Sequence, residues 1–290
     1  MIWFILLTKC YNFMDYASWH FYHSHAFPDS KFLIINNDSS IKLPCENDDI
    51  QIDLHGFPNQ HQLYGDIING KYGRMFNDGD YLVFIDDDEF LYYHDPNDKE
   101  KDVKFKDIID IGFKKYDVLA IPHINMSSKK FYHNRNFNKG LPLEYLYRRH
   151  DEATTVKCIV KYDSCKHYDF NTKSDDIIGH VPFINGKKNA AVFTGWRDVE
   201  TGNPMFLGFD IGGRSFAHID YSSNVRLYHY HIKSEIDWEH KIARGSCASI
   251  IPWYDYDISK NIFFGEYETL DESMSHEYKR ITRMSSKMEE

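Results

Sequence analysis

Four consecutive acidic residues at the end of a strand-forming run constrain the fold more than any other feature of the chain. The run extends from Tyr81 to Ile85, and the acids are Asp86, Asp87, Asp88 and Glu89. Adjacent carboxylates repel one another, and a hard divalent cation with oxygen ligands is the commonest way to offset that repulsion. Ligands of open α/β sheets bind at the carboxyl ends of the strands. We therefore expect a metal at the lip of a cleft, where it bridges protein carboxylates to substrate phosphates.

The four acids also suit a solvated turn. Aspartate is a good N-cap, and acidic residues favour the first turn of a helix. However, the acids follow an apolar run and are followed directly by the apolar Phe90 and Leu91. Apolar residues this close on both sides favour a buried site over a surface turn.

The composition limits the fold to one large α/β domain or two small ones. A chain of 290 residues with 42% hydrophobic residues is long enough for a sizeable core. The aromatic fraction of 16% suits a sugar-binding or base-binding cleft, and equally an ordinary core. A formal net charge of −10, with no block of clustered Lys and Arg, argues against nucleic-acid binding. One nucleotide held through a metal remains compatible with this charge.

The cysteines and the amino-terminal segment indicate a soluble protein of a reducing compartment. Five irregularly spaced cysteines without a Cys-x-x-Cys pair favour free thiols and provide no zinc motif. The apolar stretch from Met1 to Leu7 is too short for a membrane span and lacks a small-residue cleavage site. We expect it to be the first strand of a soluble, cytoplasmic protein without a transmembrane anchor.

The first part of the chain has the strand, helix, strand order that builds a parallel sheet. Strands are expected at Ile2 to Leu7 and Lys31 to Ile35, with a helix from Asp15 to His25 between them. The histidines of this helix fit an aromatic helical face better than a metal site. Asp38, in the polar loop after the second strand, suits recognition of a ribose or a base edge, and equally a turn.

No repeat or linker divides the chain, so we expect one domain from residue 1 to 270, followed by a charged segment from 271 to 290 that forms a partly ordered helix or a tail. Residues 45–65 predict a polar loop and residues 67–76 a helix. The basic, Asn-rich segment 129–142 predicts a mobile loop over the cleft. Helices are further expected at 105–113 and 235–244, and strands at 117–122, 144–149, 157–162 and 225–232.

Three motifs, spaced over most of the chain, resemble those of a known enzyme group. They are Lys9-Cys10-Tyr11-Asn12, then Phe84 to Leu91 with its Asp-x-Asp-Glu core, and finally His229-Tyr230-His231-Ile232-Lys233-Ser234 followed by Trp238, Lys241, Arg244 and Gly245. In form and order they resemble the motifs of glycosyltransferases with the GT-A fold, in the family 2-like group that includes the family 92-type enzymes. Phe13 stands where that group usually has an acid.

The resemblance implies a Rossmann-like, nucleotide-sugar-binding α/β fold, with a mixed, mostly parallel central sheet flanked by helices. Residues 1–125 would form the nucleotide-sugar-binding half and residues 126–270 the acceptor-binding half. The implied donor is a UDP-sugar held by Mn²⁺ or Mg²⁺. The implied acceptor is a hydroxyl of a glycan or glycoprotein, and family analogy favours inversion at the anomeric carbon.

Carried over to this chain, the motifs assign roles to the residues around the donor. The metal ligands would be Asp86, Asp88 and His229, a mixed oxygen and imidazole set that suits Mn²⁺ better than Ca²⁺. Lys233 and Arg244 would neutralise the charge of the leaving diphosphate. The remaining donor contacts implied are Thr8, Asn12, Asp38 and Asp87.

An inverting transfer needs one carboxylate base near the acceptor hydroxyl. Asp198 is the first candidate because Trp196 lies two positions before it, as an aromatic platform for a sugar or equally as a core residue. Glu200, Asp210 and Asp220 are competing candidates. Each of these four acids also suits a plain surface position.

Two other functions remain open. A metal-dependent nucleotidyl or phosphoryl transferase also uses clustered carboxylates, but the chain has no Gly-x-x-x-x-Gly-Lys-Ser/Thr phosphate loop. A catalytically silent sugar-binding module could keep the same fold, and loss of metal binding would indicate it. The composition and the lack of an anchor favour a bacterium or a large DNA virus as the source. In the viral case, the enzyme would act in the host cytoplasm on a viral structural glycoprotein.

Overall fold

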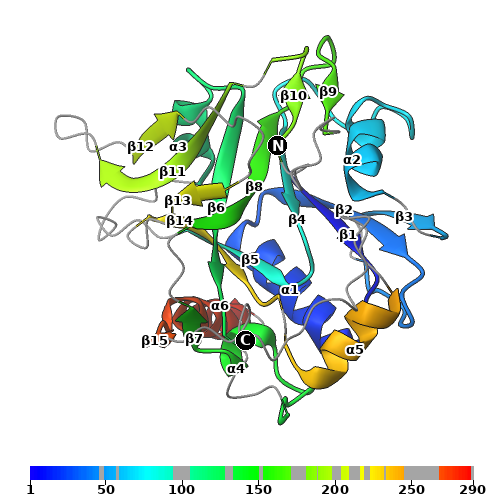
Figure 1. The fold of residues 1–290 in the computed structure, drawn as a ribbon, viewed down its shortest axis with the longest axis vertical. Helices are drawn as coiled ribbons and strands as arrows, with labels where there is room; N and C mark the ends of the chain where they lie inside the picture. Colours follow the sequence, from blue (N-terminus) through cyan, green and yellow to red (C-terminus); the bar gives the residue numbers. More distant parts are fainter. Residues whose placement is uncertain are drawn as a thin grey trace.

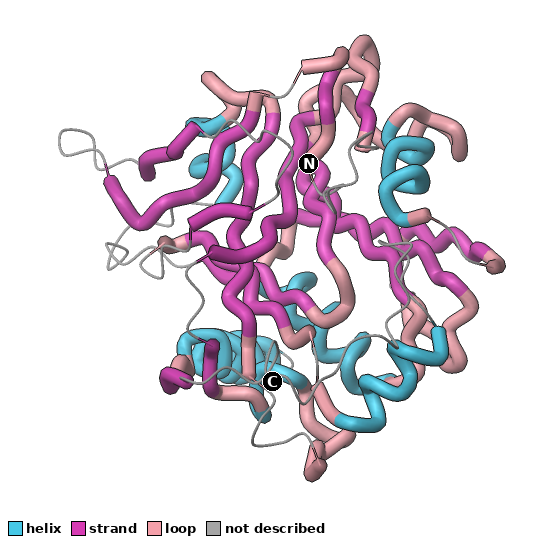
Figure 2. Tube along the Cα trace, viewed as in Figure 1, coloured by secondary structure: helices cyan, strands magenta, loops and turns pink. Residues whose placement is uncertain are grey.

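A computed structural model describes most of the chain, and the structural statements below concern those residues. They are 1–45, 49–56, 59–93, 105–127, 133–149, 153–170, 181–187, 189–197, 204–208, 216–218, 223–231, 233–244 and 268–288. The chain forms an α/β structure in which one large mixed sheet is flanked by helices (Figures 1 and 2). This confirms the α/β class expected from the sequence.

The central sheet contains the strands predicted for the first part of the chain. Its order is β3-β2-β1-β4-β8-β6-β11-β12. All strands of this path except β8 and β12 run in the same direction, so the sheet is mixed and mostly parallel. The bounds are β1 Ile2–Thr8, β2 Ser30–Asn37, β3 Ile50–Leu54, β4 Tyr81–Ile85, β6 Val118–Asn125, β8 Ala153–Lys161, β11 Ala190–Arg197 and β12 Pro204–Gly208.

Helices cover both faces of the sheet because its central strands are apolar on both sides. On β1, Phe4 and Leu6 belong to one core, and Trp3 and Ile5 belong to the other. Residues of α1, α3 and α6 line the first core, and residues of α2 line the second. Burial on both faces explains why β1 and β4 are continuous apolar runs in the sequence. The bounds are α1 Phe13–Ala26, α2 Gln60–Ile68, α3 Phe105–Gly112 and α6 Ser273–Met288.

An arm beside the central path carries the carboxyl-terminal motif to the end of β4 (Figure 1). β5 (Glu89–Tyr93) pairs antiparallel with β14 (Val225–His229), and β14 pairs parallel with the end of β6. This register places His229 between Glu89 of β5 and Asn125 of β6. The smaller elements are α4 Leu141–Glu144, β7 Tyr147–Arg149, β9 Tyr168–Asp169, β10 Phe183–Ile184, β13 Phe216–His218, α5 Glu235–Arg244 and β15 Glu268–Leu270.

The two predictions for residues 45–76 are wrong. The segment expected to be a loop contains β3 and most of α2, and the helix expected at 67–76 has already ended at Ile68. Asn59 caps α2, because its side chain accepts hydrogen bonds from the backbone N–H groups of His61 and Gln62. A side-chain cap at this position starts the helix earlier than the apolar pattern indicates.

The loop expected to be mobile over the cleft is fixed in its described part, residues 133–142. Arg135 is buried there, and its guanidinium pairs with Asp15 and Asp237. The backbone N–H of Asn136 also donates to a carboxylate oxygen of Glu144, at 2.6 Å. The basic composition that indicated mobility thus includes a cation used inside the molecule.

Residues 273–288 belong to the segment expected to be a partly ordered helix or a charged tail, and they form the helix α6. Met274 and Ile281 belong to the same core as β1 and α1. The charged residues lie on the exposed side, where Arg280 pairs with Glu277. The helix packs against α1 and α4, so a narrow apolar stripe is enough to attach it.

Candidate functional site

The acidic turn and the end of β1 meet at a switch point of the sheet. β1 lies between β2, to which it connects through α1, and β4, which begins the other side of the sheet. Open α/β sheets bind ligands at such a point, at the carboxyl edge. Thr8, the last residue of β1, donates a hydrogen bond from Oγ1 to Asp87 Oδ2 at 2.5 Å. Two of the motifs found in the sequence are therefore adjacent in the fold.

Asp88 is the buried carboxylate that faces the carboxyl-terminal motif. It is 5% exposed, and its Oδ2 accepts a hydrogen bond from Lys241 Nζ at 3.1 Å. Its Oδ1 lies 3.7 Å from Nε2 of His229, which is too far for a hydrogen bond. Burial alone would raise the pKa of Asp88, but Lys241, beside its Oδ2, holds it well below its ordinary value. The carboxylate is therefore charged, with one oxygen directed at an imidazole nitrogen.

Asp86 and Glu89 share a buried lysine. Lys157 of β8 lies 2.7 Å from Asp86 Oδ2 and 3.6 Å from Glu89 Oε2. Gln60 of α2 donates to Asp86 Oδ1 at 2.9 Å. Burial alone lowers the pKa of Lys157, but these two carboxylates raise it above its ordinary value, so the ammonium stays charged. Glu89 is fully buried, and burial raises the pKa of its carboxyl group.

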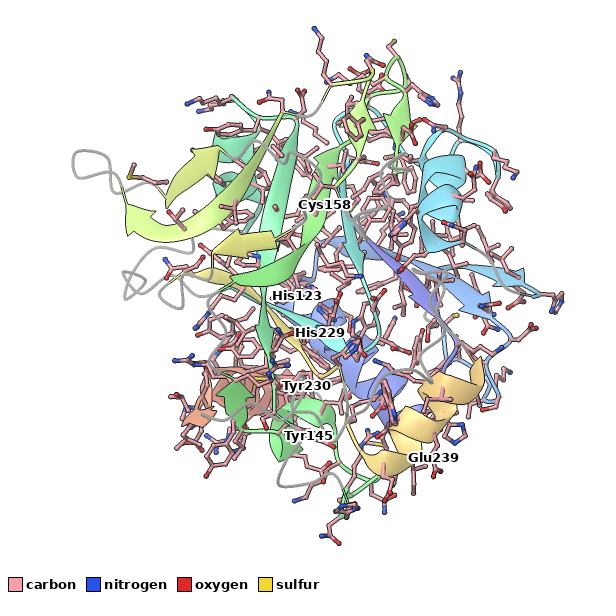
Figure 3. The ribbon with its side chains drawn as sticks, viewed as in Figure 1. His123, Tyr145, Cys158, His229, Tyr230 and Glu239 are labelled. Atoms are coloured by element: carbon pink, nitrogen blue, oxygen red, sulfur yellow. The ribbon has the colours of Figure 1, made fainter. Side chains whose placement is uncertain are left out.

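His229 is oriented by neighbours on β6 and in the acidic turn. Its Nδ1 lies 3.2 Å from Asn125 Oδ1, and this acceptor favours the tautomer with the proton on Nδ1. Nε2 then presents a lone pair toward Asp88. Nδ1 of His231 lies 3.3 Å from the same Nε2. Burial, and next the neighbouring His123, lower the pKa of His229 well below its ordinary value, so its ring is neutral. Figure 3 shows His123 and His229 together in the middle of the molecule, with ring centroids 4.7 Å apart.

A buried ion cluster holds α5 and the segment 133–140 against the start of α1. Arg135 donates from Nη1 to both carboxylate oxygens of Asp237, at 2.6 and 2.7 Å, and from Nη2 to Asp15. Lys233 donates from Nζ to Asp15 Oδ2 at 2.7 Å. Burial alone lowers the pKa of Lys233, but Asp15 raises it above its ordinary value. The cluster thus keeps a charged lysine beside the acidic turn.

A small pocket opens where these groups meet. Its volume is about 30 Å³, which is the space of one water molecule or ion. Its lining includes Asp88, Lys233 and Lys241. Cys10 also lines it, but burial and the nearby Asp87 raise the pKa of this thiol to about 12. Cys10 is therefore protonated, which makes it a poor nucleophile.

A larger cavity lies over the ends of β2 and β3, at the same carboxyl edge. Its volume is about 930 Å³, and its lining includes Phe13, Asn36, Asp38, Asp53 and His55. Asp38 has a φ of 52°, a left-handed backbone conformation that is typical of a turn. Its Oδ1 lies 2.6 Å from His55 Nδ1, and this hydrogen bond lowers the pKa of Asp38 and raises that of His55. The cavity has the size of a small-molecule site.

The carboxylates of the turn could hold a metal ion. One oxygen from each of Asp86, Asp88 and Glu89 lie within 4.8 Å of one another. A charged carboxylate next to a neutral imidazole, here that of His229, is a donor set suited to Mn²⁺ and similar divalent ions. Bonds of about 2.1 Å allow two ligands of one ion to stand as far apart as Asp88 Oδ1 and His229 Nε2, which are separated by 3.7 Å. The residues present therefore fit a divalent cation.

The predicted site residues fall into two groups. Those that converge at the acidic turn are Thr8, Asn12, Asp86, Asp87, Asp88, His229 and Lys233. The side chain of Asn12 is used there to cap α1, because it accepts a hydrogen bond from the backbone N–H of Met14. Asp38 lies apart from the turn, in the larger cavity.

Several of the predicted site residues lie outside the described part of the chain. Trp196 belongs to β11 and Arg244 ends α5, but their side chains are outside the described part of the chain. The four candidate bases are also outside the described residues: Asp198, Glu200, Asp210 and Asp220. Their roles stay predictions.

Sequence reasoning missed several residues that build the site. Lys157 and His123 are single polar residues within apolar strand runs, and that interruption was the available signal. Lys241 belongs to the recognised motif, but its contact with Asp88 had not been anticipated. Arg135 and Asn125 gave no local signal, because their partners lie far away in the sequence.

None of the helices in the described part of the chain combines the length and apolar content needed to cross a bilayer. A scan against protein-family models found no match for this chain, and a search of curated proteins found none either.

Proposed function

We propose that this chain is a metal-dependent glycosyltransferase with a GT-A fold, which moves a sugar from a nucleotide sugar, in the first place a UDP-sugar, to a hydroxyl of a glycan or glycoprotein. The observation that carries the proposal is the convergence of Asp88, His229 and Lys233 at the switch point of the sheet. Candidate metal ligands and buried cations at this edge are the groups that a diphosphate requires.

The larger cavity supports a nucleoside beside that diphosphate. Phe13 lies at its edge, at the start of α1, and is 51% exposed, so its ring is available to stack on a base. Asp38 and Asp53 offer carboxylate oxygens to ribose hydroxyls or to a base edge. In this proposal the donor extends along the carboxyl edge, with its base over β2 and β3 and its diphosphate at the end of β4.

The chain's own residues have distinct tasks in the proposed reaction. When bound, the divalent cation supplies Lewis-acid stabilisation of the leaving diphosphate. Lys233 and Lys241 add positive charge at a buried position, where salt screens it little. Asn125 keeps His229 in the tautomer that can bind metal. The base that accepts the proton of the acceptor hydroxyl is sought among Asp198, Glu200, Asp210 and Asp220, with inversion as the expected outcome.

The test exposes the protein to a panel of nucleotide sugars with and without Mn²⁺. Two quantities are measured, the thermal shift of the protein and the release of free nucleoside diphosphate. We expect one nucleotide sugar to stabilise the wild type and to be cleaved only with metal. Asp88→Asn should abolish both effects, because it removes a charged ligand. Asp66→Asn is the matched control, since Asp66 pairs with the exposed Lys71 away from the turn, and it should behave as the wild type.

Each alternative has its own outcome. If a nucleotide sugar binds but its sugar is transferred neither to an acceptor nor to water, the protein would be a silent sugar-binding module. Cleavage of nucleoside triphosphates in place of nucleotide sugars would indicate a phosphoryl or nucleotidyl transferase. Metal binding without any effect of nucleotide sugars would refute the proposed function.

A further inference from the structure

Lys241 places a positive charge next to Asp88, the carboxylate with the most favourable position for binding a metal ion. It extends from α5, and its Nζ donates to Asp88 Oδ2 and to the backbone carbonyl of His231. The side chain is 12% exposed, so water screens this contact only partly. The other oxygen of Asp88 is the one that faces His229.

The charges around the turn leave room for one more cation. Within the described chain, six carboxylates and four cations are linked around the pocket. The carboxylates are those of Asp15, Asp86, Asp87, Asp88, Glu89 and Asp237, and the cations are Arg135, Lys157, Lys233 and Lys241. Lys9 also lines the pocket, so six carboxylates stand against five cations, and a bound metal ion would reduce the remaining excess of negative charge.

The cations of the cluster differ in how firmly they are held. Arg135 bridges Asp15 and Asp237, and Lys157 bridges Asp86 and Glu89. Each of these two therefore has two carboxylate partners. Lys241 contacts Asp88 and the backbone carbonyl of His231, and its side chain is the most exposed of the four, at 12% against 0 to 8%. This exposure makes it the cation of the four that can most readily turn toward a ligand.

We propose that Lys241 is an internal counter-ion that competes with the divalent cation for Asp88 and turns to an anionic ligand when the cation binds. An ammonium and a divalent ion on one carboxylate repel each other across a few ångströms. The long, flexible lysine side chain can swing away from that repulsion, and a nearby diphosphate gives it a new partner. The competition between Lys241 and the metal needs no assumption about function. The movement of Lys241 to a diphosphate rests on the proposed function.

The proposal makes metal and anionic ligand bind cooperatively. Without nucleotide, the metal must displace Lys241 from Asp88, so metal affinity is reduced. With a nucleoside diphosphate present, the displaced ammonium gains an anionic partner and the loss is recovered. By thermodynamic linkage, the nucleotide then raises metal affinity by the same factor by which metal raises nucleotide affinity.

The experiment measures the Mn²⁺ dissociation constant by electron paramagnetic resonance, first without nucleotide and then with saturating UDP. Without nucleotide, Lys241→Met should bind Mn²⁺ about tenfold more tightly than the wild type. This change corresponds to about 1.4 kcal/mol of binding free energy. The gain in affinity on adding UDP should be several-fold smaller in this variant. Lys241→Arg keeps the charge and should stay within about threefold of the wild type.

Lys166→Met is the matched control, because Lys166 pairs with Asp117 at the amino end of β6 and should leave Mn²⁺ binding unchanged. Unchanged or weaker Mn²⁺ binding in Lys241→Met, with Lys241→Arg still folded and binding as the wild type, would overturn the competition. If Lys241→Met does not fold, tighter binding in Lys241→Gln supports the proposal and unchanged binding overturns it. Tighter Mn²⁺ binding without any response to UDP would leave the competition standing and refute the nucleotide-dependent function.

Discussion

At the scale of single residues, the acidic turn is compatible with folding because its first three carboxylates have separate partners. Asp86 contacts Lys157 of β8, Asp87 accepts a hydrogen bond from Thr8 of β1, and Asp88 contacts Lys241 of α5. These partners come from three different elements, so the repulsion among the acids is offset only when the whole site is assembled. The turn is therefore a product of tertiary structure rather than of local sequence.

His23 shows the same dependence on its surroundings, and it predicts how stability varies with pH. Its Nδ1 lies 2.8 Å from the carbonyl of Trp19, and its Nε2 accepts a hydrogen bond from the backbone N–H of Leu91. Both nitrogens are thus used by the neutral ring, and burial lowers the pKa of His23 from 6.5 to about 3. The structure confirms that this histidine belongs to the core and not to a metal site.

Between the two pKa values, the unfolded chain binds a proton at His23 that the folded protein does not. The contribution of His23 therefore lowers the free energy of unfolding as pH falls from about 6.5 toward about 3. The expected slope is about 1.4 kcal/mol per pH unit within this window. Urea denaturation at several pH values from 4 to 7 measures it, and His23→Gln, which does not titrate, should flatten the curve.

The control for this experiment is His25→Gln on the same helix. His25 is exposed, and its ring contacts Phe21 and Ser24 of the same helix turn. This variant should keep the slope of the wild type. Equal slopes for His23→Gln and the wild type would show that His23 does not contribute to the acid sensitivity.

At the scale of elements, Arg135 attaches the segment 133–140 to two helices. Its guanidinium is fully buried between Asp15 of α1 and Asp237, in the first turn of α5. Arg135→Met leaves the two buried carboxylates without this cation, and removing one partner of a buried ion pair costs about 3 to 5 kcal/mol. We expect this loss in the free energy of unfolding measured in urea.

The control is an ion pair of similar length on the surface. Lys106 and Asp110 on α3 are 2.7 Å apart, and both side chains are partly exposed. Lys106→Met should cost less than about 1 kcal/mol, since such pairs contribute little. Similar losses for Lys106→Met and Arg135→Met would contradict the anchoring role of Arg135.

The helix α6 offers a comparison between two methionines. Met274 is 1% exposed within the core, whereas Met284 is 53% exposed on the same helix. Met274→Ala should lower the free energy of unfolding by about 2 to 4 kcal/mol, and Met284→Ala by less than about 0.5 kcal/mol. Equal effects in urea denaturation would mean that α6 is not packed on the core and that residues 271–290 behave as a tail.

The elements that could be predicted are those with local signals. β1, β2 and β4 are continuous apolar runs buried on both faces, and the aromatic spacing of α1 marks its buried side. β3 was missed because it is an edge strand with alternating, partly exposed residues. The predicted position of α2 is wrong because the start of the helix is set by the cap at Asn59 rather than by its apolar residues.

The site could be predicted where its residues are adjacent in sequence and not where they meet through strand register. The acids of the turn could be predicted because the four residues are consecutive in the sequence. The position of Asn125 and His123 near His229 depends on the pairing of β14 with β6, which no local pattern specifies. Lys157 depends likewise on β8 lying antiparallel to β4.

At the scale of the whole molecule, the two proposed halves of the chain are interleaved in one sheet. β8 comes from the second half but lies between β4 and β6 of the first half. β14, also from the second half, lies between β5 and β6. The core therefore does not separate at residue 125, so the proposed nucleotide-binding and acceptor-binding halves would differ in function and not in folding.

This interleaving predicts that residues 1–125 do not fold alone. Without β8, the backbone groups of β4 at Leu82 and those of β6 at Leu119 lose their hydrogen-bond partners, and apolar strand edges of this kind aggregate. The full chain should unfold with coincident fluorescence and circular dichroism transitions, whereas the fragment should lack near-ultraviolet dichroism. Co-expression with residues 126–290 should restore soluble protein, because it supplies β8 and β14. A soluble fragment 1–125 with native-like near-ultraviolet dichroism would mean that the first half has its own core and that the sheet joins two independent domains.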